Sequence, residues 1–260
     1  MEKNLVLVII DPQNDFIDGT LKVHGADGDM NKLSLFIDAN HKTISSIYLT
    51  LDTHVRLSIF FPGFWRSTVN GKEPPPFTII KDGDVPDVWT PININDVFHC
   101  ASYLENCTGK SLTIWPYHCL IGHQGHNVHT PLLNALQRWE EESGKQVEYV
   151  IKGLSQYTEQ YSAFKADVII EDDPSTHLNV HLMNTLLSHK TVVFAGEAKS
   201  HCVNMSVRDL VKYAGSGERI RVLTDACSNV AGFDDVGILF EYEMRKRGVK
   251  FVSTFEKTQI

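Results

Sequence analysis

One cysteine of this chain has the surroundings that a nucleophile needs. Cys202 follows the apolar run Thr191 to Ala195 across the turn Gly196-Glu197-Ala198-Lys199-Ser200-His201, and the next residues predict a helix that begins at Cys202. A free thiol has a pKa of about 8.5 and reacts as the thiolate, so a reactive cysteine needs a helix N-terminus, a cation or a base beside it. The first amides of the predicted helix would supply one of these features.

Two further residues that could take part in chemistry follow apolar runs of the same kind. Asp11 comes directly after Leu5 to Ile10, and Lys152 comes directly after Val147 to Ile151. Ligands of an open α/β sheet bind outside the carboxyl ends of its strands, so we expect both side chains to meet Cys202 at one edge. Lys152 would supply positive charge, and Asp11 would take the thiol proton and return it to a leaving amine. The set predicts nucleophilic hydrolysis of an amide.

We interpret the other four cysteines as structural thiols, namely Cys100, Cys107, Cys119 and Cys227. The role of Cys119 stays the most open of the four, because this residue directly follows a histidine. Five cysteines are an odd number, and they include no Cys-x-x-Cys pair. This spacing argues against a disulfide framework and against a zinc ribbon.

A second group of residues has the types and spacing of metal ligands. Asp52 and His54 are two positions apart at the end of a predicted strand, so both side chains leave the same face. His118 lies in a turn that Pro116 keeps from being helical and offers a third ligand. Two histidines and one aspartate, with water completing the sphere, are typical of a catalytic zinc site. Three other histidines stay open as competing ligands, namely His123, His126 and His129.

Composition excludes several classes of protein. The chain has 260 residues, 42% hydrophobic and 22% charged, as is typical of a soluble globular protein. Its formal charge of −8 would repel nucleic acid. The apolar run near the start, Leu5 to Ile10, is too short for a signal peptide or a membrane span. We therefore expect a cytoplasmic protein that binds neither nucleic acid nor membrane.

Short β-branched runs alternate with amphipathic stretches, which predicts an α/β fold: one doubly wound, mainly parallel six-stranded sheet with helices on both faces. The expected strands are residues 5–10, 47–51, 147–151, 191–195, 220–224 and 250–253, and the expected helices are 31–41, 131–142, 178–189, 202–213 and 234–247. Residues 1–260 are expected to form a single domain with a long irregular insertion at about 55–111 and one helix at 93–104. An insertion of this length predicts a lid, a wall of the binding site or an oligomer contact.

Five motifs in this order resemble those of the isochorismatase-like cysteine hydrolases, and within them the nicotinamidases. They are Asp11-Pro12-Gln13-Asn14-Asp15-Phe16, Asp52-Thr53-His54, Trp115-Pro116-Tyr117-His118-Cys119, Lys152-Gly153 with Tyr161-Ser162-Ala163-Phe164 downstream, and Gly196-Glu197-Ala198 before Cys202-Val203. The resemblance implies a catalytic triad at Asp11, Lys152 and Cys202, and a divalent metal at Asp52, His54 and His118, most often zinc, with manganese or iron as alternatives.

The same resemblance implies further roles for residues around the nucleophile. The peptide bond between Glu197 and Ala198 would be cis, and the amides of Ala198 and Cys202 would form an oxyanion hole. Pocket walls would fall on Phe16, Trp115 and Tyr161. Two departures are visible: no histidine lies between His54 and His99, and Glu197 is charged where many members of the family carry an apolar residue.

The resulting hypothesis is a hydrolase of linear amide C–N bonds that converts nicotinamide to nicotinate and ammonia through a thioester, as part of NAD salvage, and that forms a homo-oligomer. One alternative is a related amidase or carbamoyl hydrolase acting on another small amide. Another is a catalytically silent binding subunit, with the aromatic segment from Phe60 to Trp65 as its contact surface.

Overall fold

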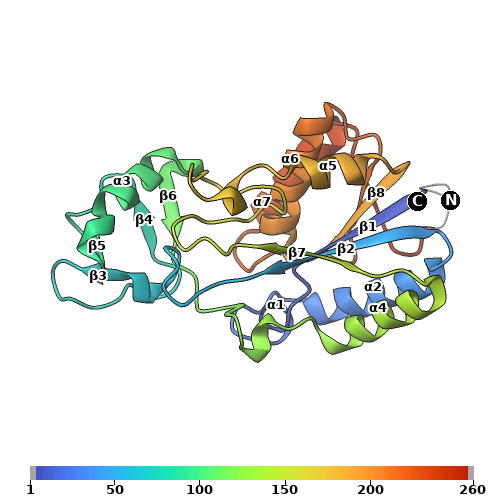
Figure 1. Ribbon diagram of the computed structural model, residues 1–260, viewed down its shortest axis with the longest axis horizontal. Coiled ribbons are helices and arrows are strands. Elements are labelled where there is room, and N and C mark those ends of the chain that lie inside the picture. Colours follow the sequence, from blue (N-terminus) through green and yellow to red (C-terminus); the bar gives the residue numbers. More distant parts are fainter. Residues whose placement is uncertain (1–3, 257–260) are drawn as a thin grey trace.

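The centre of the molecule is a sheet of six parallel strands (Figure 1). The computed structural model describes residues 4–256, so the two ends of the expected domain, residues 1–3 and 257–260, lie outside the described residues. The strand order is β10-β9-β8-β1-β2-β7, and all neighbouring pairs are parallel. This confirms the predicted doubly wound α/β fold. The strands are β1 (Leu5–Ile10), β2 (Ile44–Asp52), β7 (Glu148–Lys152), β8 (Thr191–Gly196), β9 (Ile220–Leu223) and β10 (Lys250–Val252).

Strand β1 shows why the sheet is covered on both faces. All of its side chains are buried, and successive side chains of a strand point to opposite faces. Leu5, Leu7 and Ile9 pack in one buried cluster with α2 (Ala26–Asn40) and α4 (Thr130–Ser143). Val6, Val8 and Ile10 pack in a second cluster with α5 (Val180–Leu187), α6 (Asn204–Ala214) and α7 (Asp234–Lys246). Figure 1 shows these two helical layers on either side of the sheet.

Several helices begin at other residues than the apolar spacing predicts, and two of them, α2 and α5, show the physical reason. Helix α2 starts at Ala26 instead of 31, directly after Gly25, whose φ of +97° suits a glycine. Its first turn carries Asp27 and Asp29, so the apolar period starts only later. Helix α5 starts at Val180 instead of 178, because the Asn179 side chain accepts a hydrogen bond from the Leu182 amide at 2.9 Å.

The segment expected to be irregular contains four short strands. Strand β3 (Trp65–Ser67) pairs antiparallel with β5 (Trp89–Pro91), and β4 (Ile79–Lys81) pairs antiparallel with β6 (Ser111–Thr113). Helix α3 spans Val97–Asn106, whereas the sequence predicted 93–104. Each of these strands is three residues long, too short for an alternating pattern to stand out. Together they form the end of the molecule farthest from the chain termini (Figure 1).

The aromatic residues from Phe60 to Trp65 are interior residues, so the predicted contact surface at these positions is wrong. Phe60, Phe61 and Trp65 are 0% exposed and Phe64 is 2% exposed. They belong to the same buried cluster as the side chains of α2 and α4. Apolar side chains clustered in a sequence can pack inward as readily as outward, and only the tertiary structure decides between the two. Within residues 4–256, no helix is long and apolar enough to cross a membrane.

Candidate active site

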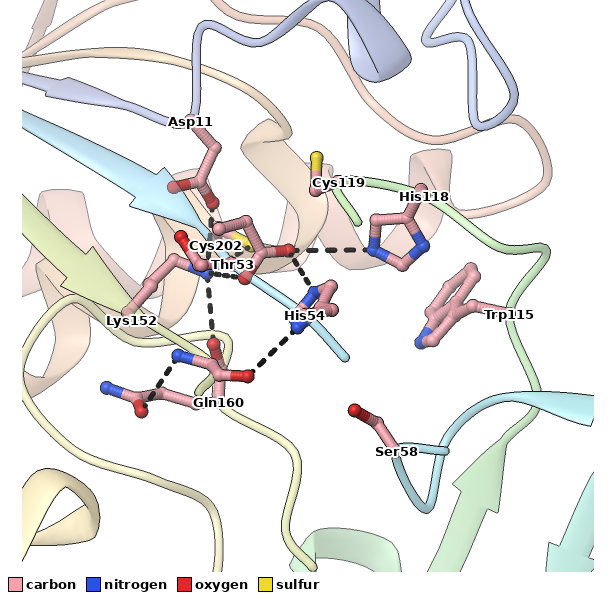
Figure 2. A network of polar contacts seen from close by, with 12 residues as sticks. Asp11, Thr53, His54, Ser58, Trp115, His118, Cys119, Lys152, Gln160 and Cys202 are labelled. Atoms are coloured by element: carbon pink, nitrogen blue, oxygen red, sulfur yellow. Dashed lines mark hydrogen bonds and ion pairs between the residues drawn. The ribbon is translucent and has the colours of Figure 1, made fainter. Parts of the chain in front are cut away.

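The candidate site lies where β1, β2, β7 and β8 end (Figure 2). Asp11 follows β1, Asp52 closes β2 and Lys152 closes β7, while Cys202 follows β8 after a short turn. Parallel strands bring their carboxyl ends to one edge, and this edge therefore collects residues that are far apart along the chain. All four side chains are buried, with exposed fractions of 6% or less.

Asp11 is held in one orientation by a residue of the neighbouring strand. Its amide donates to the Thr50 hydroxyl oxygen at 2.9 Å, and that hydroxyl donates to Oδ1 of Asp11. Oδ2 lies 3.0 Å from the ammonium nitrogen of Lys152. Burial raises the pKa of Asp11 and outweighs the opposite effect of Lys152. A carboxyl group with a raised pKa is suited to carry a proton near neutral pH.

Lys152 contacts each of the other polar groups in this part of the site. Its ammonium nitrogen donates to Oδ1 of Asp52 at 2.8 Å, to the carbonyl oxygen of Gln160 at 3.0 Å and to Sγ of Cys202 at 3.7 Å. Burial lowers the pKa of Lys152, but the carboxylates of Asp11 and Asp52 hold it well above its ordinary value. Lys152 is therefore a buried cation that touches the candidate nucleophile.

Cys202 does not open a helix as the sequence predicted. It lies in a π-helical turn, Lys199–Val203, and α6 begins only at Asn204. Burial holds the pKa of the Cys202 thiol well above its usual range, although Lys152 lowers it, and the carboxyl group of Asp11 adds to the rise. The thiol is thus the resting form, and it needs a base to become a nucleophile. Asp11 is the candidate base, because its carboxyl group and the Cys202 sulfur both contact the Lys152 ammonium nitrogen.

Asp52, His54 and His118 form the one group of potential metal ligands found among the described residues. Their ligand atoms lie within 4.8 Å of one another, and all three side chains are buried. Oδ2 of Asp52 lies 2.9 Å from Nε2 of His54 and 3.5 Å from Nε2 of His118. Figure 2 shows His54 and His118, each joined by a dashed line to a carboxylate oxygen.

The surroundings of these three residues fit a divalent cation. Nδ1 of His54 contacts the carbonyl oxygen of Gly153 at 3.0 Å, and Nδ1 of His118 contacts that of Pro116 at 2.8 Å. Such bonds place the proton on Nδ1 and leave Nε2 free to bind a metal. Gly153 has φ +76°, and a Cβ on it would approach the His54 ring to 2.6 Å. The backbone thus approaches the ligands as closely as only glycine allows.

The competing histidines lie elsewhere. Nε2 of His126 contacts the Thr53 hydroxyl at 2.9 Å, His129 faces Asp27 at 3.8 Å, and His123 is exposed. His99 contacts the carbonyl oxygen of Tyr157 at 2.8 Å. None of them belongs to the group of ligands found within residues 4–256.

A pocket joins the candidate nucleophile to the candidate metal ligands. The expected walls Phe16, Trp115 and Tyr161 all line it, and the Trp115 indole donates to the Tyr161 hydroxyl at 3.1 Å. The full lining comprises Phe16, Leu21, Asp52, Trp115, His118, Glu159, Tyr161, Ala198, His201, Cys202 and Val230. The peptide bond from Glu197 to Ala198 is cis, as the resemblance implied. An aromatic pocket of this kind suits a flat heteroaromatic ring.

Two titratable residues of the pocket were missed by the sequence reasoning, as were the apolar Leu21 and Val230. His201 packs against Trp115, Tyr161 and Phe233 with ring centroids 5.4, 5.5 and 4.7 Å away, and burial lowers its pKa to about 4. Its position next to Cys202 was an available signal. Glu159 is 5% exposed, and burial raises its pKa to about 7. No local pattern marks Glu159, because it reaches the pocket from an irregular segment after β7.

The other four cysteines are free and buried, and none lines this pocket. Burial raises the pKa of each of them, for Cys100 to about 12. Unlike Cys202, these thiols do not line the pocket, which agrees with the structural role expected for them.

No protein-family model and no curated protein sequence matches the chain. Solved structures do match it over nearly its whole length. An Acinetobacter baumanii nicotinamidase/pyrazinamidase is 21% identical, with 98% of each chain covered and a TM-score of 0.66. A Pyrococcus horikoshii pyrazinamidase in complex with zinc is 19% identical, with 96% of this chain and 99% of that chain covered and a TM-score of 0.58.

A third matching structure is named for a different substrate, a carbamoyl compound. An N-carbamoylsarcosine amidase from Thermoplasma acidophilum is 15% identical, with 98% of this chain and 99% of that chain covered and a TM-score of 0.53. The resemblance to isochorismatase-like cysteine hydrolases is therefore confirmed for the fold. A fold can carry several activities, so the reaction has to be argued from the site.

Proposed function

We propose that this chain is a metal-dependent cysteine amidohydrolase that converts nicotinamide to nicotinate and ammonia. The observation that carries the proposal is the arrangement of Cys202, Lys152 and Asp11 at one side of an aromatic pocket, with the Asp52, His54 and His118 group adjoining it. The nicotinamidases and pyrazinamidases among the matching structures support it. The reaction would supply nicotinate for NAD salvage.

The first half of the reaction forms a thioester. Asp11 takes the thiol proton of Cys202, and the sulfur attacks the carboxamide carbon. The amides of Ala198 and Cys202 stabilise the negative oxygen that develops. Asp11 then gives its proton to the departing amino group, so the C–N bond breaks and ammonia leaves. Lys152 remains a cation throughout and balances the charge that passes between sulfur and carboxylate.

The second half regenerates the enzyme. Asp11 takes a proton from water, the hydroxide attacks the thioester carbon, and the C–S bond breaks to release nicotinate. The proton on Asp11 returns to the Cys202 sulfur. Asp52, His54 and His118 would hold a divalent cation, most often zinc in the resembling family, and when bound it would supply a Lewis-acidic partner for the ring nitrogen. Phe16, Trp115 and Tyr161 hold the ring and keep water from the reacting carbon.

The test is ammonia release from nicotinamide, with and without chelator, at known protein concentration. Cys202→Ala should abolish ammonia release while the far-ultraviolet circular dichroism stays unchanged. Cys107→Ala, a matched change of another buried thiol outside the pocket, should retain activity. Ammonia release by the Cys202→Ala variant would contradict the proposal.

A second candidate is a carbamoyl amidase, favoured by the match to the N-carbamoylsarcosine amidase. The buried Asp52, His54 and His118 group argues for the nicotinamidase, because a site without a metal has no need of two histidines aimed at one carboxylate. Metal content of the purified chain and relative rates on nicotinamide and N-carbamoylsarcosine separate the two candidates. A metal-free chain that prefers the carbamoyl compound would favour the second.

A further inference from the structure

Glu197 places a carboxyl group in the interior, directly before the Ala198 amide. It is 0% exposed. The backbone on both sides of Ala198 is held by hydrogen bonds, since Glu197 N–H donates to the Ile10 carbonyl at 2.8 Å and Lys199 N–H donates to the Ser228 carbonyl at 2.7 Å. The Glu197 side chain therefore sits between the turn after β8 and the loop after β9.

A second buried carboxyl group meets Glu197 there. Asp29 of α2 is 5% exposed, and its carboxyl group interacts electrostatically with that of Glu197. Ser228 joins both, because its amide donates to Oε2 of Glu197 at 3.2 Å and its hydroxyl donates to Oδ2 of Asp29. Two carboxylates in contact repel each other strongly in the interior, so one of them keeps a proton.

The surroundings decide which carboxyl group is protonated. Asp29 lies in the first turn of α2, where the helix dipole favours a negative charge, and it accepts the Ser228 hydroxyl. Burial holds the pKa of Glu197 well above its usual range, and the negative charge of Asp29 adds to this effect. Burial raises the pKa of Asp29 too, but not as far, so the surroundings favour the proton on Glu197, from where it can be donated to Asp29. The other titratable groups that act on this pair are Lys32, Lys199, Asp225 and Cys227.

We propose that Glu197 is a positioning residue whose protonated carboxyl group, bonded to Asp29, holds the Ala198 amide in the orientation that stabilises the oxyanion. The inference rests on the proposed amide hydrolysis, in which that oxyanion forms. Loss of the proton would place two adjacent negative charges in the interior and push the turn away from α2. Glu197 touches neither substrate nor the reacting atoms, so it acts only through the Ala198 amide.

The kinetic test compares Glu197→Gln with Glu197→Ala across a range of pH. An alanine leaves the turn without its tie to Asp29, so kcat should fall at least about tenfold while KM changes less than about twofold, since an oxyanion contact acts on the transition state. In the wild-type chain, kcat should fall at alkaline pH as Glu197 loses its proton. Glutamine still donates to Asp29 and cannot ionise, so Glu197→Gln should restore most of kcat and reduce this fall at alkaline pH. An alanine variant with wild-type kcat, or a glutamine variant with the wild-type alkaline decline, would overturn the inference.

A spectroscopic test does not depend on the substrate. The wild-type chain should show the infrared carbonyl stretch of a protonated carboxylic acid near neutral pH, and Glu197→Gln should remove that band in the difference spectrum. Glu218→Gln, a change at an exposed position, should remove no such band. Absence of the band from the wild-type spectrum overturns the shared proton. A wild-type chain that does not hydrolyse nicotinamide contradicts the proposed function. In that case the infrared band alone tests whether Glu197 and Asp29 share a proton.

Discussion

The ammonium nitrogen of Lys152 lies 2.8 Å from Oδ1 of Asp52, while Oδ2 of the same carboxylate faces His54 and His118. One carboxylate thus joins the cation beside Cys202 to the candidate metal ligands. Burial raises the pKa of Asp52, but its interactions with His54 and with the Lys152 cation hold it well below the ordinary value. Asp52 is therefore ionised, and a change of charge in one half of the site reaches the other half through it.

Replacing Lys152 by methionine should destabilise the fold as well as stop the reaction. The change leaves the buried carboxyl groups of Asp11 and Asp52 without their shared cation. Loss of one partner from a buried ion pair costs about 3–5 kcal/mol of unfolding free energy, measured by urea denaturation. Lys110→Met removes an exposed pair with Asp82 at 3.7 Å and should cost less than about 1 kcal/mol. Equal costs for the two variants would argue against a buried cation at 152.

Removing one candidate ligand should reduce metal binding in a way that does not depend on turnover. His54→Ala should weaken zinc affinity at least about hundredfold, measured by competition with a chelating dye. Even the loss of a residue that only hydrogen-bonds to a metal ligand lowers metal affinity about 10–100-fold, and His54 would itself be a ligand. His123→Ala is the matched control, since His123 is exposed and lies outside the ligand group. Stoichiometric zinc retained by the His54→Ala chain would contradict the assignment.

Gly153 should tolerate no side chain. Its φ of +76° costs about 1–2 kcal/mol for alanine, and the new Cβ would also lie 2.6 Å from the His54 ring and 3.0 Å from Asp52. Gly144→Ala is the control, because Gly144 has φ +66° but open space around it. Both variants should lose unfolding free energy, measured by urea denaturation, because alanine is strained at a positive φ. Only Gly153→Ala should also lose zinc affinity. Normal zinc binding by Gly153→Ala would show that the close approach has no role in the site.

Stability should fall with acidity because of His201. Burial lowers the pKa of His201 to about 4, below the ordinary value of 6.5, so the unfolded chain binds a proton that the folded chain does not. The unfolding free energy should therefore decrease as pH falls from about 6.5 toward about 4, and this part of the decrease should be absent from His201→Phe. Urea denaturation of both chains across that range is the measurement. Parallel pH curves for the two proteins would mean that His201 stays accessible to protons.

Local patterns were sufficient for the layered fold. The unbroken apolar run of β1 predicts a strand buried on both faces, and it is one, with Leu7 in one cluster and Val8 in the other. Asp11 and Lys152 were placed at one sheet edge because strand ends in a parallel sheet coincide, a rule that needs no side-chain detail. The structure brings them together at 3.0 Å.

Local patterns failed where the information is not local. The three-residue strands of the 55–111 segment have no detectable period, and the π-helical turn at Cys202 has the same composition as the start of an ordinary helix. Glu159 itself belongs to none of the five motifs, although Tyr161, two positions later, was expected in the pocket, and Glu159 reaches the pocket through the path of the same irregular segment.

The sequence by itself thus determined which polar residues follow the strands and the set of residues able to do chemistry, and it showed an ionisable residue, Glu197, directly before Ala198. Only the tertiary structure decided that Lys152 bonds Asp52 across a hundred positions, that Phe60 to Trp65 face inward, and that Asp29 meets Glu197 from another layer. The physical reason is that contacts between side chains of distant elements depend on how the layers pack. That packing minimises exposed apolar surface over the whole chain, and no short stretch of sequence records it.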